Sequence, residues 1–182
     1  MKNESPPTQL DIKAFAHAAS PLVGHDVLSK YDRLAQEARS LEAETPLNWS
    51  ASGEVRADES GADQIWLHLQ VDLCLPMICQ RCMGPVDVDL SIDQSFRFVA
   101  NEAAAEAEDE EAEEDILVMS QEFNLHDLIE DEVLMALPVV PRHETCPVDV
   151  KLEVVDAGFE TALTEKLNPF AALASLKSGK SS

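Results

Sequence analysis

Four side chains at two separate places in the sequence have the types and the spacing of a metal site. Cys79 and Cys82 are separated by two residues, and so are His143 and Cys146. Thiolates and imidazoles are the ligands of structural zinc, and a closed tetrahedral site needs four of them. The pattern therefore predicts one structural zinc ion bound by Cys79, Cys82, Cys146 and His143.

Two features around the cysteine pair leave alternatives open. Cys74 lies five residues before Cys79, and it is the alternative to His143 as the fourth ligand. Gly84 follows the cysteine pair and would permit the positive φ that a metal-binding turn often uses. The alternative to any metal site is that these are ordinary reduced cysteines, which pack as small apolar side chains.

The residues after the C-x-x-C motif disfavour a redox enzyme. In thioredoxin-like proteins this motif caps a helix, which lowers the pKa of the thiol. Here Pro85 and a strand pattern follow the motif instead. The chain also lacks a G-x-S-x-G motif, a phosphate-binding glycine loop and an H-E-x-x-H motif. We therefore expect a protein that is not an enzyme, with a thiol-redox protein as a minor alternative.

The charge of the chain limits the partners that it can attract. The formal net charge is −22, from 35 acidic and 13 basic residues. Most of such a surface repels free nucleic acid and attracts basic partners. Arg81 lies between the two cysteines, so a metal-bound turn would hold it outward. Lys177 and Lys180 make the C-terminus locally basic. We expect Arg81, Lys177 and Lys180 to contact RNA or a partner.

The sequence contains no segment that targets the chain to a membrane. Residues 1–7 lack the apolar core of a signal peptide. The longest apolar runs, residues 73–79 and 133–140, are too short to span a bilayer. We expect a cytoplasmic protein that contacts no membrane and has no small-molecule substrate. Cytoplasmic thiols stay reduced, which again favours metal binding over a disulfide.

Hydrophobic periodicity predicts the elements that must position these residues. Apolar and polar residues alternate over residues 47–55, 65–73 and 86–98, which predicts three strands with one solvated face. Helical spacing predicts helices at 11–19, 27–41 and 125–137. Pro21 and Gly24 end the first of these, and Asn124 caps the last. Residues 116–118 are a further candidate strand. The predicted fold class is α+β, with an antiparallel meander of at least three strands and packed helices.

Composition divides the chain into one domain and three segments that bury no core. We expect a flexible N-terminus over residues 1–9, a single domain over 10–176 and a basic flexible tail over 177–182. Within the domain, residues 101–115 contain nine acidic side chains and no basic one. Like charges repel one another and form no core, so this stretch is predicted to be a disordered acidic loop. Its alternative role is to mimic the charge of nucleic acid and compete for a basic surface.

Three segments together resemble the YceD family, the large ribosomal RNA accumulation proteins. They are Cys79–Cys82, the acidic and apolar run 130–141 with the trailing His143, and residues 168–177, which read Asn-Pro-Phe-Ala-Ala-Leu-Ala-Ser-Leu-Lys. Their order and spacing also match, with an acidic variable stretch between the first two. The resemblance covers most of the chain from about residue 45.

The resemblance implies a role in the synthesis, processing or stability of 23S rRNA, and so in assembly of the large ribosomal subunit. The implied partner is the large-subunit precursor or 23S rRNA, contacted directly or through a ribosomal protein. The family supplies no catalytic residues. A different hypothesis, based on the charge of the chain, is an acidic chaperone that binds a basic ribosomal protein.

Overall fold

The structure is a computed structural model that describes residues 6–37, 44–58, 61–108, 112–151 and 154. The chain forms two compact units, residues 1–146 and residues 147–182. Every helix and strand of the described residues belongs to the first unit. No described helix is both long enough and apolar enough to cross a membrane.

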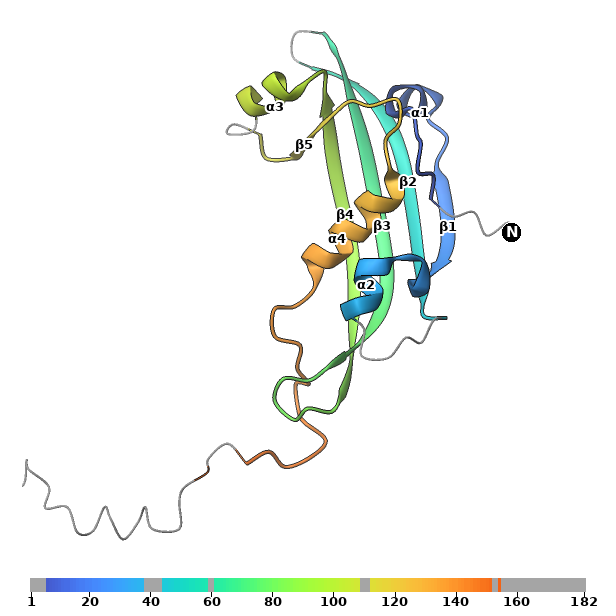
Figure 1. Cartoon of the computed structure of the whole chain (residues 1–182). Helices are drawn as coiled ribbons and strands as arrows, with labels where there is room; N and C mark the ends of the chain where they lie inside the picture. The colour runs from blue at the N-terminus through green and yellow to red at the C-terminus, as the bar shows by residue number, and fades with distance from the viewer. Residues whose placement is uncertain (1–5, 38–43, 59–60, 109–111, 152–153, 155–182) are drawn as a thin grey trace, which may run out of the picture. The chain divides into compact units, whose positions relative to one another are not determined.

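The first unit is built on one curved sheet of five strands (Figure 1). The strands follow the chain in the order β1 (Leu22–Val27), β2 (Pro46–Ala57), β3 (Asp63–Ile78), β4 (Pro85–Val99) and β5 (Asp115–Val118). β1 to β4 are antiparallel neighbours, whereas β5 runs parallel to β4. β3 and β4 pair from Ile65 opposite Phe98 to Ile78 opposite Pro85. This long hairpin places the Cys79–Gly84 turn at the far end of the sheet.

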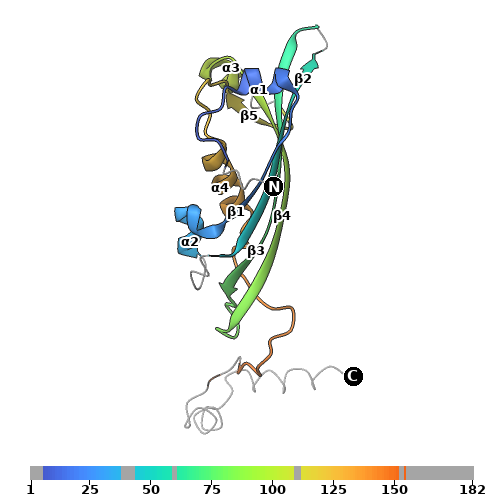
Figure 2. The ribbon, with the colours of Figure 1, turned by 90° about the vertical axis from the view of Figure 1, so that its right-hand side faces the viewer.

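One face of the sheet carries the core, and the other face is open. Helices α1 (Ile12–Ala18), α2 (Asp32–Glu37) and α4 (Leu125–Ala136) lie on the same side of the sheet, as Figure 2 shows. A single 3₁₀ turn, η1 (Leu28–Lys30), precedes α2. The largest fully buried side chains come from the helices and from alternate positions of β2, β3 and β4: Ile12, Leu28, Tyr31, Leu34, Leu47, Leu67, Leu69, Val71, Leu75, Phe96, Leu125 and Ile129.

Local sequence accounts for how α1 and α4 begin and pack. Asp11 caps α1 by accepting a hydrogen bond from the Ala14 amide at 2.9 Å. Asn124 caps α4 in the same way, through the Asp127 amide at 3.3 Å, as predicted. α1 passes so close to β2 that a Cβ atom on Gly53 would lie 2.6 Å from the Cα atom of Ala16. Only glycine fits at this crossing.

The α+β class and the antiparallel meander are confirmed, and three predicted segments differ in detail. The segment after Pro21 forms β1 rather than a connection, because it pairs along β2 from Leu22 opposite Ala51 to Val27 opposite Pro46. The helix predicted at 27–41 is divided into η1 and α2, and its residues 38–41 lie outside the described residues.

The acidic stretch 101–115 differs from the expected disordered loop. Residues Glu102–Glu108 form helix α3, and β5 begins at Asp115; residues 109–111 lie outside the described residues. Alanine and glutamate are strong helix formers, and the Asn101 side chain caps α3 by accepting from the Ala104 amide at 3.0 Å. The charge is offset by Arg97 on β4, whose side chain is 10% exposed. Its guanidinium donates to Glu108 at 2.6 Å and to Glu114 at 2.5 Å. Two carboxylates that repel each other in an isolated segment are therefore both bound to one buried cation.

Candidate metal centre

The turn between β3 and β4 presents the first two predicted ligands. The Cys79 amide donates to the Gly84 carbonyl at 2.9 Å, and the Met83 amide donates to the Cys79 carbonyl at 2.8 Å. Met83, not Gly84 as predicted, has the positive φ of this turn, at 58°. Gly84 has a different role, because a Cβ atom there would lie 3.4 Å from Cys82 Sγ. This is an ordinary van der Waals distance, so Gly84 lies directly against that sulfur.

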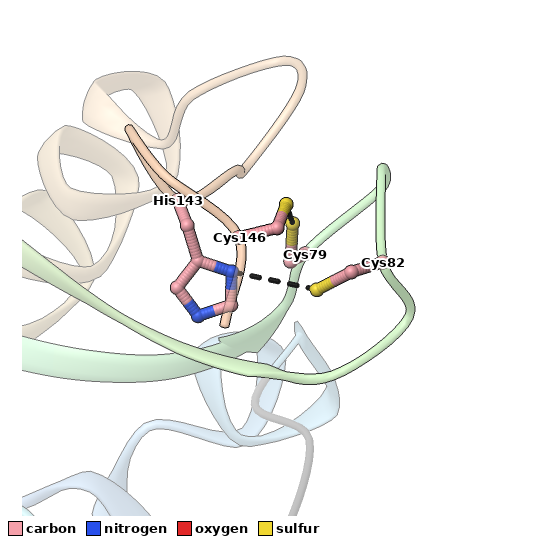
Figure 3. A group of neighbouring side chains, drawn as sticks. All are labelled: Cys79, Cys82, His143 and Cys146. Carbon is pink, nitrogen blue, oxygen red and sulfur yellow. Dashed lines mark hydrogen bonds between the residues drawn. The ribbon is translucent and has the colours of Figure 1, made fainter. Parts of the chain in front are cut away.

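The segment after α4 brings the other two ligands to this turn. α4 ends at Ala136, and residues 137–146 continue without regular structure toward the turn. The Gln80 amide donates to the Pro141 carbonyl at 2.8 Å, which joins the two segments directly. Two residues later, His143 faces Cys82, and Cys146 faces Cys79 (Figure 3).

The distances within this group match those of a tetrahedral metal site. Cys79 Sγ lies 3.9 Å from Cys146 Sγ, and Cys82 Sγ lies 3.5 Å from His143 Nδ1. The four ligand atoms all lie within 4.8 Å of one another. Tetrahedral zinc, with bonds of about 2.3 Å to sulfur and 2.0 Å to nitrogen, separates two sulfurs by about 3.8 Å and sulfur from nitrogen by about 3.5 Å. The donor set and its spacing therefore fit one tetrahedral ion of the zinc type.

The backbone around the cluster already favours one thiolate. Burial raises the pKa of the Cys79 thiol, but the amides of Cys82, His143 and Arg81 donate to its sulfur and lower the pKa to about 5. The pKa of Cys146 is instead raised, by burial and by the neighbouring Cys82 and Cys79. A bound cation would favour the thiolate at both. A redox-active cysteine also has a lowered thiol pKa. A redox pair consists of two thiols, however, and would not account for the third thiol and the imidazole in this group.

Cys74, the alternative fourth ligand, lies outside this group. It is exposed on β3, opposite Asp89 of β4. A hydrogen bond to the Asp89 carboxylate, with smaller contributions from burial and from Asp87, raises the pKa of Cys74 to about 11. Cys74 is excluded by its position, because it is not among the four residues whose ligand atoms lie within 4.8 Å of one another.

The structure describes only one of the three basic residues that were predicted to contact RNA or a partner. Arg81 is exposed at the tip of the turn, on the outer side of the cysteine pair. Lys177 and Lys180 lie outside the described residues. Arg142, which the sequence analysis did not select, is also exposed and directly precedes the ligand His143. Its position beside a predicted ligand is the signal that could have identified it.

A buried carboxylate holds α4, and with it the segment that carries His143 and Cys146. Glu130 is 5% exposed and accepts hydrogen bonds from the Arg33 amide at 2.8 Å and the Arg33 Nε at 2.7 Å. The Leu34 amide also donates to Glu130, at 3.3 Å. Burial raises the pKa of Glu130, but these hydrogen bonds outweigh burial and lower it below its usual range. Glu130 therefore joins α4 to the first turn of α2.

Comparison with known proteins places the chain among relatives. The family described as Large ribosomal RNA subunit accumulation protein YceD matches residues 67–177, which include both halves of the cysteine and histidine cluster. The chain belongs to the YceD family. The Large ribosomal RNA subunit accumulation protein YceD of Haemophilus influenzae is 30% identical over 159 residues, covering 85% of this chain and 86% of the relative. No solved structure matches the chain.

Proposed function

We propose that this protein is a non-enzymatic factor of ribosome biogenesis that supports the synthesis, processing or stability of 23S rRNA. Membership of the YceD family carries this proposal, together with the printed name of the Haemophilus influenzae relative. The cysteine and histidine cluster supports a structural role for its residues, because its four side chains occupy the four positions that a closed structural site needs. A closed site leaves no open position for a substrate, which is consistent with a protein that binds rather than catalyses.

In this proposal one zinc ion is bound by Cys79, Cys82, Cys146 and His143. The ion joins the β3–β4 turn to residues 141–146, two segments that are also linked by the hydrogen bond from the Gln80 amide to the Pro141 carbonyl. The Arg81 side chain on the outer side of the turn, with Lys177 and Lys180, contacts RNA or a partner on the large-subunit precursor. The protein acts in the cytoplasm.

The test of this function is complementation of a strain that lacks the protein. We expect the intact chain to restore the ratio of 23S to 16S rRNA, and we expect Cys79→Ser and Cys146→Ser to fail. Cys74→Ser is the matched control, because Cys74 lies outside the cluster. Zinc content of the purified proteins, measured by mass spectrometry, should be about one ion per chain for the intact protein and Cys74→Ser. A 23S to 16S ratio that does not change on deletion of the gene would refute the proposal.

The open face of the sheet favours a second candidate, an acidic chaperone for a basic ribosomal protein. Asp72 of β3 and Asp87, Asp89 and Asp93 of β4 share the face that no described helix covers (Figure 2). None of these four carboxylates makes an ion pair with a described residue. A shallow hollow of about 400 Å³ lies there and includes Asp72 and Asp89 in its lining. Unpaired carboxylates on a solvated sheet attract basic polypeptides.

The two candidates predict different results when the protein is captured from growing cells with and without ribonuclease. Precursor 23S rRNA that disappears with ribonuclease supports the first candidate. A basic ribosomal protein that stays bound after ribonuclease, and is lost in the double variant Asp87→Asn/Asp89→Asn, supports the chaperone. Glu102→Gln/Glu106→Gln is the control for charge, because it removes two exposed carboxylates of α3 and keeps Glu108 and Glu114, which pair with Arg97.

A further inference from the structure

Arginine side chains in the described part of this acidic chain follow a simple pattern. Arg33, Arg56 and Arg97 each form an ion pair with at least one carboxylate. Arg81 and Arg142 are exposed and form none. In a chain with 35 acidic residues a carboxylate partner is the usual situation for an arginine. The two exceptions lie on two segments that a backbone hydrogen bond joins, although 60 residues separate them in sequence.

The backbone brings these two arginines together beside the metal cluster. The Gln80 amide donates to the Pro141 carbonyl at 2.8 Å, and Arg81 and Arg142 are the residues that follow these two. Arg81 lies between Cys79 and Cys82 in sequence, and Arg142 directly precedes His143. The ligand side chains point into the cluster (Figure 3), and the two arginines are exposed to solvent. Both backbone positions are therefore fixed by the cluster while both guanidinium groups stay available.

We propose that Arg81 and Arg142 form a phosphate-binding pair through which this protein contacts the backbone of RNA. The inference rests on the proposed function, because the 23S rRNA of that proposal is the source of the phosphates. A guanidinium presents a planar fork of N–H donors that matches two phosphate oxygens, and two such groups on adjoining segments suit neighbouring phosphates of one strand. The exposed carboxylates of the open sheet face, Asp87 and Asp89 among them, repel phosphate, so RNA should approach from the side of the turn that carries the two arginines.

The charge beside these arginines depends on the cluster and on one carboxylate. A divalent cation bound by three thiolates would cancel two of their three negative charges. Glu144 is the remaining exposed carboxylate on the same segment, and it makes no ion pair with a described residue. Removal of its charge should therefore strengthen the attraction for phosphate.

The test is binding of a fluorescent single-stranded fragment of 23S rRNA to the full-length, zinc-loaded protein, followed by anisotropy over a series of salt concentrations. Each phosphate contact on a single strand contributes about 0.7 to the slope of log affinity against log salt concentration. The double variant Arg81→Ala/Arg142→Ala should therefore lower the magnitude of the slope by about 1.4, with affinity about tenfold weaker at low salt. Glu144→Gln should bind RNA more tightly than the intact protein.

Lys13→Ala is the matched control for loss of positive charge. Lys13 is an exposed residue of α1, which lies at the other end of the sheet from the Cys79–Gly84 turn (Figure 1). Its replacement should leave the slope unchanged. Zinc content and thermal unfolding of each variant show whether the cluster is intact, since no ligand has been replaced. An unchanged slope in the double variant, or an equal loss in Lys13→Ala, would overturn the proposal.

Two further outcomes separate this inference from the proposed function. If the double variant loses RNA affinity while deletion of the gene leaves the ratio of 23S to 16S rRNA unchanged, the phosphate-binding pair stands and the proposed function fails. If RNA affinity is unchanged but an acidic protein from the large-subunit precursor no longer binds, the arginines recognise carboxylates of a protein and the RNA proposal is wrong.

Discussion

Several contacts hold residues 125–146 to the rest of the first unit, and two of them differ in how complete they are. Glu130 in α4 accepts three hydrogen bonds from Arg33 and Leu34, at 2.7 to 3.3 Å. The ligand atoms of the cysteine and histidine cluster make weaker contacts with one another, such as 3.9 Å between Cys79 Sγ and Cys146 Sγ and 3.5 Å between Cys82 Sγ and His143 Nδ1. The Glu130 carboxylate therefore has its hydrogen-bond donors within the protein. The cysteine and histidine cluster instead brings four good metal ligands together without strong bonds between them.

This difference separates a part of the fold that is stable by itself from one that depends on a ligand. A buried carboxylate with charged and backbone donors needs no further partner. Thiols and imidazole gain little from one another and much from a metal ion, because binding energy at such a site is also folding energy. With the proposed zinc ion bound, the position of the segment that carries Arg142, His143 and Cys146 would depend on the metal, whereas that of α4 would not.

Removal of the metal should have the largest effect, and it should be confined to one of these two contacts. With chelator, the amides of residues 79–84 and 139–146 should exchange with deuterium much faster, because they lose the ion that joins the two segments. The amides of α4 should stay protected. Hydrogen exchange followed by mass spectrometry measures both, and Cys74→Ser should respond to chelator as the intact protein does. Exchange that is the same with and without chelator would contradict a metal at this cluster.

Glu130→Ala should destabilise the protein by about 2–4 kcal/mol, because it leaves the Arg33 and Leu34 amides without an acceptor. Glu132→Ala, two residues along the same helix, is the control. Burial and then the charges of Asp115 and Asp131 raise the pKa of Glu132, so its carboxylate gains nothing from its surroundings. We expect a change within about 0.5 kcal/mol for that variant. Urea unfolding measures both, and equal losses would show that Glu130 has no special role.

The same carboxylate predicts a pH dependence of stability. Because the pKa of Glu130 is lower in the folded protein than its usual value, the unfolded state binds the proton more readily. Its contribution is therefore full above the ordinary glutamate pKa of about 4.3 and is lost as pH falls through the lower folded value. The difference in unfolding free energy between the intact protein and Glu130→Gln should shrink over that acidic range. A difference that stays constant down to pH 3 would rule out the shift.

Met83→Gly should have the smallest effect and should act only at the cluster. Met83 has a φ of 58° and is 67% exposed, so a glycine relieves backbone strain without loss of packing. The relief is about 1 kcal/mol and should appear as tighter metal binding in a competition titration. Gln80→Gly, at another exposed position of the same turn, is the control. It should weaken metal binding, because Gln80 has no positive φ and a glycine there relieves no strain. Weaker binding by Met83→Gly would show that the side chain itself matters.

Local patterns in the sequence were enough for elements whose periodicity is strong. The alternation in β2, β3 and β4 and the Asn124 cap of α4 both depend on neighbouring residues, and the structure has them where they were predicted. β1 was missed because it depends on hydrogen bonds to β2. α3 was missed because its acidic charge was given more weight than its local helix signals, which are a run of alanine and glutamate and the Asn101 side chain that accepts from the Ala104 amide at 3.0 Å. Arg97 of β4 adds a contact that no local pattern predicts, because it binds both Glu108 at the end of α3 and Glu114 beyond it.

The sequence by itself determined the candidate ligands, since residue type and the two short spacings already select Cys79, Cys82, His143 and Cys146. Only the tertiary structure decided that His143 rather than Cys74 joins the other three, because alternate residues of a strand face opposite sides of the sheet and Cys74 faces the open side. It also decided that Arg142 lies beside Arg81. That proximity comes from the length of the β3–β4 hairpin and from the path of the chain after α4, and no local pattern encodes a contact across 61 residues.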